Sequence, residues 1–191
     1  MRLIIYKAVK ADQKEFVEFW SSQYDYVKEF LYEKNIRQKM TEQSILNLYE
    51  WKNGRPLFAH QKTSVRENFI KHIDDLKTLQ SDISANNFLI LFPHGGPIWR
   101  IFWLHCWQPD RFPIYDQHVH RAMAFIQNGV IEEIPRTEKG KIESYCNRYL
   151  PFHEKFATIE GRAVDKALWV FGKFIKINPK FPTDYKLKIL T

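Results

Sequence analysis

Apolar residues recur three or four positions apart along most of this 191-residue chain, and this spacing constrains the fold more than any other feature. Residues spaced in this way share one face of an α-helix, which can then be buried. About seven segments show the pattern, and no repeated strand pattern accompanies them. Since only helices are available to build a core, the sequence predicts an all-α fold.

Local signals mark where the first helices begin and end. Asp12 and Glu15 have the spacing of a capping box, and the apolar pattern that follows predicts one helix over about residues 13–34. Thr41 can cap the next helix. Gly54 can end that helix, because glycine tolerates the positive φ of a helix C-terminus.

Further along the chain the signals are of the same kind. Ser64 and Glu67 also have capping-box spacing, and they predict a helix whose apolar face ends at Leu76. A later helix is predicted over residues 142–150. Pro151 is expected to interrupt it, because proline lacks the amide hydrogen that a helix interior requires.

The two ends of the chain are less regular. Residues 2–9 could form an isolated strand or an extended arm, and the tail from Asn178 contains two prolines and is expected to be irregular. The N-terminus has no small-residue cleavage site, and no apolar run approaches the length of a membrane span. We therefore expect a soluble, cytoplasmic protein with no membrane partner.

Charge and aromatic content bear on the type of partner. The chain has 29 Lys and Arg against 22 Asp and Glu, a formal net charge of +7, and 16% of its residues are aromatic. A basic surface favours polyanions through the release of counterions. Aromatic side chains can fill a core, but they can also stack on nucleic-acid bases.

The cysteine content argues against a metal or disulfide framework. Only Cys106 and Cys146 are present, and two cysteines in a chain of this type are expected to be free thiols. They cannot form a four-cysteine zinc or iron–sulfur set. We therefore expect no cofactor and no metal.

The segment from Phe92 to Met123 contains the residues that most suggest a binding or catalytic role. It contains a glycine turn, a strongly apolar helix that begins with Pro97, a short connector, and Asp116 at the start of another helix expected to end at Gly129. Backbone amides in a glycine turn can bind a phosphate oxygen, because no side chain blocks the approach. The unpaired amides at a helix start favour the charged form of an aspartate.

Two motifs in this segment resemble those of the helix-hairpin-helix DNA glycosylases, the HhH-GPD superfamily, and in particular its endonuclease III-like members. Residues 92–98 (FPHGGPI) fall on the family hairpin, and residues 115–121 (YDQHVHR) fall on the family aspartate motif. The spacing between the two motifs needs no gap. Residues 161–174 also look like the terminal helix of that family.

The resemblance implies a fold and an activity. The expected fold is a single domain over residues 1–191, made of two interleaved helical lobes, with the hairpin and aspartate motif at residues 92–123. The expected activity is base-excision repair of double-stranded DNA, in which a damaged or modified nucleotide is flipped out of the helix. Asp116 would be the catalytic residue, stabilising an oxocarbenium-like sugar or positioning the attacking water.

The same comparison suggests the residues that contact DNA. Gly95 and Gly96 would present backbone amides to a phosphate. His94 stands where the family has its first hairpin glycine, and it could either weaken the contact between amide and phosphate or add a phosphate contact of its own. Arg100 and Arg121 are plausible phosphate ligands.

Departures from the family pattern refine the expectation. Ile98 stands where bifunctional members have the lysine that attacks the sugar, so this chain should lack the lyase reaction and act as a monofunctional DNA N-glycosylase that uses water. Gln117 replaces the usual threonine. The iron–sulfur cysteines of some members are absent. We expect a monomer that associates with the nucleoid in the cytoplasm.

Structural explanations compete with these roles. Asp116 could be only a helix cap. His118 and His120 are two positions apart and do not face each other on a helix, so a structural role is favoured over metal binding. Arg121 could pair with a carboxylate inside the fold, and the tryptophans that recur every four residues between positions 99 and 107 are typical of a buried helix stripe.

Two other functions remain open. The chain could be a DNA-binding module that recognises damage without catalysis, since the family lysine is missing and the hairpin is altered. It could also be a helical interaction protein with no DNA role. The lysines at positions 166, 173 and 176 are expected to lie on solvated helix faces.

Overall fold

The computed structural model describes residues 11–177, and every regular element in that range is helical. The predicted all-α fold is therefore confirmed. The expected strand or arm at residues 2–9 and the expected irregular tail from Asn178 lie outside the described residues.

The helices are short, and most are joined by tight connections. In chain order the described elements are α1 (Gln13–Ser22), α2 (Glu29–Glu33), α3 (Glu42–Asn53), α4 (Ala59–Asn68), the 3₁₀ turn η1 (Ile70–His72), α5 (Ile73–Leu76), α6 (Ala85–Leu91), α7 (Pro97–Trp107), α8 (Gln117–Asn128), α9 (Glu138–Ser144), the π-helical segment η2 (Tyr145–Tyr149), α10 (Leu150–Glu154) and α11 (Gly161–Ile177).

These elements form two compact units, each made from segments that are distant in the sequence. We call one the hairpin unit; it contains residues 25–115 and 135–151. We call the other the Asp116 unit; its described residues are 11–24, 116–134 and 152–177. Both the N-terminal and the C-terminal described segments therefore belong to the Asp116 unit.

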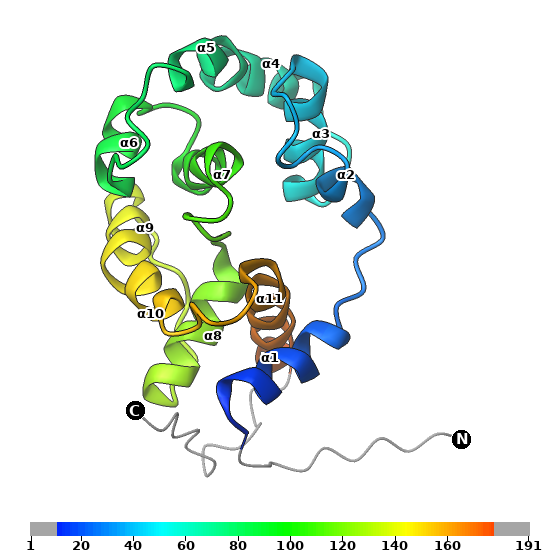
Figure 1. Ribbon diagram of the computed structural model, residues 1–191, viewed down its shortest axis with the longest axis vertical. Coiled ribbons are helices and arrows are strands. Elements are labelled where there is room, and N and C mark those ends of the chain that lie inside the picture. The colour runs from blue at the N-terminus through cyan, green and yellow to red at the C-terminus, as the bar shows by residue number, and fades with distance from the viewer. Residues whose placement is uncertain (1–10, 178–191) are drawn as a thin grey trace. The chain divides into compact units, whose positions relative to one another are not determined.

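Helix α7 is the centre of the hairpin unit. Seven consecutive residues of α7, from Arg100 to Cys106, are buried, and the helix contacts α6 and α9. Figure 1 shows α7 lying within a curve formed by α3, α4, α5 and α6. Aromatic rings fill the space between them, with Phe69 stacked on Tyr49 at 4.8 Å and close to Trp103 at 5.7 Å.

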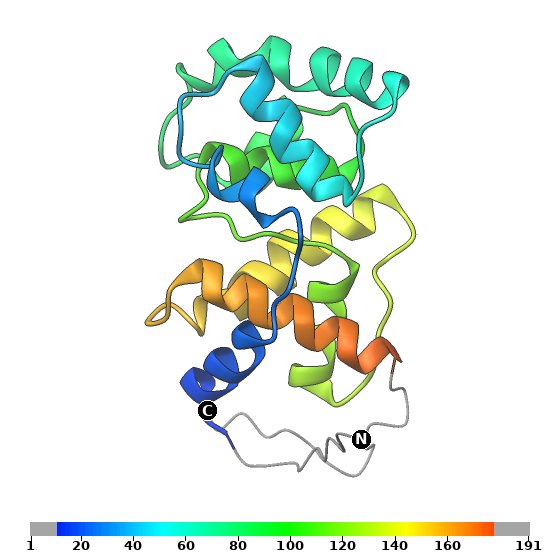
Figure 2. The same cartoon turned by 90° about the vertical axis from the view of Figure 1, so that its right-hand side faces the viewer.

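Helix α11 is the centre of the Asp116 unit, and it packs against both α1 and α8 (Figure 2). Phe171 of α11 has ring contacts with Phe16 of α1 at 5.3 Å and with Phe125 of α8 at 5.7 Å. Helices α8 and α11 approach most closely at Gly172, where a Cβ atom would lie 1.9 Å from the carbonyl oxygen of His118. Only glycine allows this crossing.

The helix predicted over residues 13–34 was wrong, because the structure has two helices there. The capping box of Asp12 and Glu15 is confirmed, but α1 ends at Ser22, where the Ser22 hydroxyl donates to the Phe19 carbonyl. Helix α2 begins only at Glu29 and belongs to the other unit. The apolar residues of the two helices therefore enter different cores, which a single periodic pattern does not reveal.

The helix predicted to start at Ser64 was also wrong. Helix α4 begins earlier, and the side chain of Gln61 accepts from the backbone amide of Phe58 to complete its first turn. Ser64 lies inside α4, where its hydroxyl accepts from Asn68. In contrast, the predicted N-caps at Thr41 and Asp116 are confirmed. The predicted helix ends at Gly54 and Gly129 are also confirmed, and both glycines have a left-handed backbone conformation.

The prediction that Pro151 interrupts its helix was wrong, because helical structure continues through this residue. The helix that contains residues 142–150 continues as α9, η2 and α10, and Pro151 is the second residue of α10. A proline is tolerated there because the first turn of a helix does not use its amide hydrogens. The wider turns of the π-helical segment η2 lie between α9 and the first turn of α10.

Substitution of Gly172 by alanine should destabilise the protein by roughly 3 kcal/mol, because the new methyl group would overlap the His118 carbonyl oxygen and push α8 away from α11. Thermal or denaturant unfolding measures this directly. Gly161→Ala in the same helix is the matched control, since its nearest neighbour would be 4.0 Å away, and it should leave stability unchanged or slightly raised. Equal effects at the two positions would contradict the close crossing.

Stability should also fall as the pH drops below 6.5, because of His153. Burial lowers the pKa of His153 from 6.5 to about 4, and the Asp165 carboxylate, at 3.9 Å, is too distant for a hydrogen bond. The folded state therefore holds His153 neutral, while the unfolded chain protonates near pH 6.5, so this stabilisation is complete above pH 6.5 and is lost toward pH 4. The loss should reach roughly 2–3 kcal/mol.

Denaturant unfolding at pH 7 and at pH 5 tests this expectation. His153→Gln removes the titrating group and should make the free energy of unfolding less dependent on pH over that window. An identical pH dependence in the variant would show that other groups are responsible.

Candidate functional site

The glycine turn before α7 has a backbone that requires glycine twice. Gly95 and Gly96 have φ values of 97° and 79°. A Cβ atom on Gly95 would lie 2.4 Å from the ring of Phe69, whereas the space beside Gly96 is open. Pro97 occupies the first position of α7, as predicted, and no side chain caps this helix start. The first-turn amides of α7 are thus suited to an anion.

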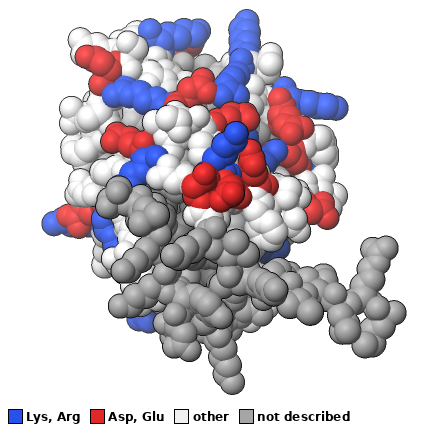
Figure 3. All heavy atoms as spheres, turned by 60° about the horizontal axis from the view of Figure 1, so that its bottom comes forward, with Lys and Arg blue, Asp and Glu red and all other residues white. Residues whose placement is uncertain are grey.

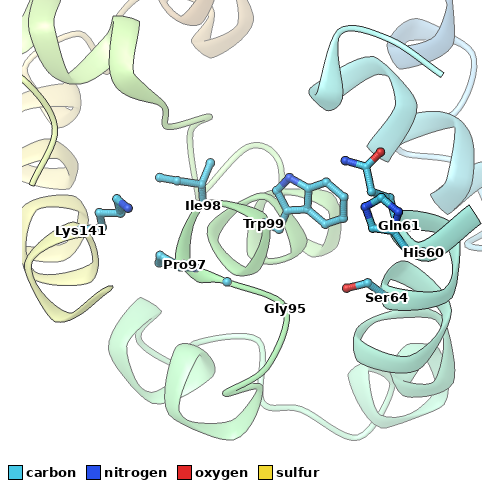
Figure 4. Close-up of a pocket in the computed structure, with 9 residues that line it drawn as sticks. His60, Gln61, Ser64, Gly95, Pro97, Ile98, Trp99 and Lys141 are labelled. Atoms are coloured by element: carbon cyan, nitrogen blue, oxygen red, sulfur yellow. The ribbon is translucent and has the colours of Figure 1, made fainter. Parts of the chain in front are cut away.

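A pocket of about 320 Å³ lies at this turn, inside the hairpin unit. Figure 4 shows the indole of Trp99 on the side of the pocket where α4 presents polar side chains, and Lys141 of α9 on the opposite side. Its lining residues are His60, Gln61 and Ser64 of α4, Gly95 and Gly96 of the turn, Pro97, Ile98 and Trp99 of α7, and Lys141 of α9. The pocket therefore combines backbone amides with polar and aromatic side chains.

Sequence reasoning did not identify the contribution of α4 and α9 to this pocket. The spacing of Ser64 and Glu67 in the sequence is that of a helix cap, and no motif distinguishes Lys141 from other lysines. His60 and Ser64 are four positions apart and so share a helix face, but the same is true of many surface pairs. Only the packing of α4 and α9 around the start of α7 brings them to the turn.

Arg100 is buried, so the DNA contact predicted for it would require its internal hydrogen bonds to break. Its Nε donates to the Phe92 carbonyl at 2.7 Å, and its two other nitrogens donate to the Leu89 carbonyl and to the Glu138 carboxylate. A guanidinium placed in this way fastens the end of α6 and the start of α9 to α7. It cannot reach a phosphate while those bonds are made.

Asp116 caps α8 with one carboxylate oxygen. Its Oδ1 accepts from the backbone amides of His118 at 2.8 Å and Val119 at 3.1 Å, and the residue is partly exposed. Both bonds and the helix dipole favour the charged carboxylate. Capping and a chemical role are compatible, because a carboxylate has a second oxygen and several acceptor positions.

The ring of His118 lies between Asp116 and α11. Its Nδ1 is 3.3 Å from a guanidinium nitrogen of Arg121, and its ring edge meets Trp169 at 5.5 Å. Burial is the main cause of a lowered pKa of His118; the Asp116 carboxylate opposes the shift, and the nearby cations reinforce it. A neutral ring that accepts from Arg121 is consistent with this environment.

No group of three potential metal ligands occurs among residues 11–177. His118 and His120 do not converge, since His120 is buried and its Nε2 lies 3.4 Å from Glu132. The two histidines thus have separate environments, as their spacing on a helix indicates.

Arg121 is fully buried, and the DNA contact predicted for it would likewise require its internal bonds to break. It donates to both carboxylate oxygens of Glu133, at 2.8 and 2.9 Å, and to the carbonyl of Gly172 at 3.2 Å. The alternative that Arg121 pairs with a carboxylate inside the fold is therefore confirmed. His94, in contrast, is exposed in the turn before α7.

The tryptophans of α7 do not form one uniform core stripe. Trp103 is buried as expected, but Trp99 and Trp107 are only partly buried. Trp99 lines the pocket, and Trp107 stacks on Phe88 at 5.3 Å.

None of the protein families, curated proteins or solved structures compared with this chain matches it. Within residues 11–177, no helix has both the length and the apolar character needed to cross a membrane. The Gly95-Gly96 turn belongs to the hairpin unit, and Asp116 belongs to the other unit.

Replacing Asp116 should separate its capping role from any chemical role. Asp116→Ala removes the bonds to the His118 and Val119 amides and should cost about 1 kcal/mol of stability. Asp116→Asn keeps a side-chain oxygen that can accept from these amides, so it should lower the free energy of unfolding by only a few tenths of a kcal/mol. Denaturant unfolding of both variants tests this, and equal losses would contradict the capping geometry.

Proposed function

We propose that this protein is a monofunctional DNA N-glycosylase, which removes a damaged or modified base from duplex DNA. The observation that carries the proposal is the layout of residues 92–123. The end of α6 leads into a glycine turn and the uncapped start of α7, and a connector then leads to the Asp116-capped α8. This is the order of parts on which the resemblance to the helix-hairpin-helix glycosylases rests.

In the proposed reaction Asp116 acts on the sugar of the flipped nucleotide. The bond between the sugar C1′ and the base nitrogen breaks, and the base departs with the bonding electrons. Positive charge develops on the sugar, and the Asp116 carboxylate stabilises it electrostatically. A water molecule then bonds to C1′ and releases a proton, while the base nitrogen takes up a proton. Water is the nucleophile because Ile98 stands at the family's lysine position.

The role proposed for the glycine turn and the start of α7 is to bind the sugar–phosphate backbone of the DNA. The amides at the start of α7 favour a phosphate oxygen, and the exposed His94 can add a donor. The pocket lined by Trp99 is open beside this turn, so a nucleotide bound there would meet both amides and an aromatic wall.

A non-catalytic DNA-binding protein is the second candidate. The burial of Arg100 and Arg121 favours this candidate, because each of these arginines of the motif segment forms hydrogen bonds within its own unit. Such a protein would bind duplex DNA in a salt-dependent manner without releasing any base.

Base release from a panel of damaged and modified duplexes tests the proposed activity. Asp116→Asn should lower the rate of release at least 100-fold, because an oriented charge opposite the developing cation is lost. Its affinity for DNA should stay close to that of the wild type, because the cap is kept. Unchanged release in this variant would refute the mechanism, and no release by the wild type across the panel would favour the second candidate.

A further inference from the structure

Two segments that line the pocket at the glycine turn contain no acidic residue. Residues 51–66 include the end of α3 and most of α4, residues 83–109 include α6, the turn and α7, and neither range contains Asp or Glu. None of the nine residues that line the pocket is acidic. On the face drawn in Figure 3, by contrast, acidic and basic side chains are interspersed. These two segments and the pocket lining therefore place no carboxylate against an anionic ligand.

An exposed aromatic ring lies beside this pocket. Phe58, the residue before α4, is 52% exposed. Its ring is stacked on the ring of His60, with the centres 5.9 Å apart and an angle of 20° between the planes. His60 also lines the pocket, and Figure 4 shows it with Gln61 on the side of the pocket that holds Trp99. The rings of Phe58 and His60 therefore form an aromatic surface that continues into the pocket.

Hydrogen bonds of Gln61 fix the position of Phe58. The backbone amide of Phe58 donates to the Gln61 side chain at 3.0 Å, and the Gln61 side chain donates to Asn53 at 3.4 Å. Gln61 thereby ties the start of α4 to the end of α3. An exposed ring on a restrained backbone loses little conformational freedom when a ligand stacks on it.

Two cations accompany the aromatic surface and the pocket. The Arg55 guanidinium lies 4.9 Å from the centre of the Phe58 ring. Lys141 lies at the opposite side of the pocket from Trp99, and it donates one hydrogen to the Arg136 carbonyl at 3.3 Å. In the described part of the chain, neither Arg55 nor Lys141 forms an ion pair with a carboxylate. Their charges therefore remain available to an anionic ligand.

An unpaired strand of nucleic acid has the two properties that these groups recognise. Its bases present flat faces that stack on aromatic side chains, and its phosphates attract cations. The bases of a fully paired duplex are stacked on one another, so their faces are not free to stack on Phe58 or Trp99. Successive nucleotides of a stacked strand lie about 3.4 Å apart. The distance of 5.9 Å between the Phe58 and His60 rings is therefore within reach of nearby nucleotides of one strand.

We infer that the hairpin unit binds an unpaired stretch of a DNA strand, with one base in the pocket against Trp99 and a nearby base on the exposed ring of Phe58. The pocket volume of about 320 Å³ is at the lower end of the range of roughly 300–1,000 Å³ for small-ligand sites, which favours a single base. The aromatic surface and the cations carry the choice of an unpaired strand. The choice of DNA rests on the proposed glycosylase function, whose substrate class would then be DNA with locally unpaired bases.

DNA probes that differ in pairing and in their bases test this inference. The affinity of the full chain is measured by fluorescence anisotropy for a single strand, for the fully paired duplex, for a duplex with a bulge of unpaired nucleotides, and for a single strand of abasic residues. The single strand and the bulged duplex should bind at least about tenfold more tightly than the other two probes, because only they offer free base faces. Charge alone would not separate the single strand from the abasic strand.

Substitutions of Phe58 test the stacking. Phe58→Ala should weaken binding of the single strand by about 5- to 150-fold, because one stacked base is lost. Phe58→Tyr keeps the ring and should bind like the wild type, whereas Phe58→Leu keeps an apolar side chain without a ring and should lose most of the affinity that Phe58→Ala loses. Arg55→Gln should lower the slope of log affinity against log salt by about 0.7, the change expected for one phosphate contact of a single strand.

Phe30→Ala is the matched control. Phe30 lies in α2 of the same unit, is 50% exposed and has the Lys34 ammonium 5.9 Å from its ring centre, but it does not line the pocket. This variant should bind the single strand like the wild type, and thermal unfolding verifies that each variant is folded. Equal losses in Phe58→Ala and Phe30→Ala, equal affinities for the abasic and the base-containing strand, or no DNA binding by the wild type would overturn the inference.

The two proposals can fail separately. If unpaired strands bind through Phe58 but the wild type releases no base from any duplex, the binding site stands and the glycosylase proposal fails. If base release depends on Asp116 while Phe58→Ala binds like the wild type, the glycosylase proposal stands and Phe58 has only a structural role at the start of α4.

Discussion

The close crossing of α8 and α11 at Gly172 is the contact on which the Asp116 unit depends. Glycine lets the two backbones approach until the His118 carbonyl occupies the place of a side chain, and Arg121 then donates to the Gly172 carbonyl while pairing with Glu133. A buried guanidinium is stable there because carboxylate and carbonyl oxygens receive its hydrogens. The crossing fixes the start of α8, and with it Asp116, next to α11.

A second buried arginine has the same function in the hairpin unit. Arg100 joins the carbonyls at the end of α6 to Glu138 at the start of α9, and it does so from within α7. The turn between α6 and α7 is held from both sides, since Gly95 lies against the ring of Phe69. In both units, then, an arginine inside the motif segment forms its hydrogen bonds within the fold and maintains the position of the neighbouring helices.

Burial of the two arginines also decides which cations each unit exposes. Arg100 and Arg121 are used inside the fold, where Glu138 and Glu133 receive their hydrogens. Among the described residues of the Asp116 unit, Lys173 and Lys176 of α11 are exposed. The Lys173 ammonium lies 4.9 Å from the centre of the Trp169 ring, and a contact of this kind restrains the lysine side chain.

The sequence by itself determined the features that depend on residues within about four positions of each other. These are the helical character, the caps at Asp12, Thr41 and Asp116, and the glycine that ends each of two helices. Only the tertiary structure decided where residues 13–34 divide between two cores, which arginines are buried, and which helices form the pocket at the glycine turn. Those outcomes depend on partners that are distant in the sequence, such as Glu138 for Arg100. A local pattern does not encode which distant residue will become the partner.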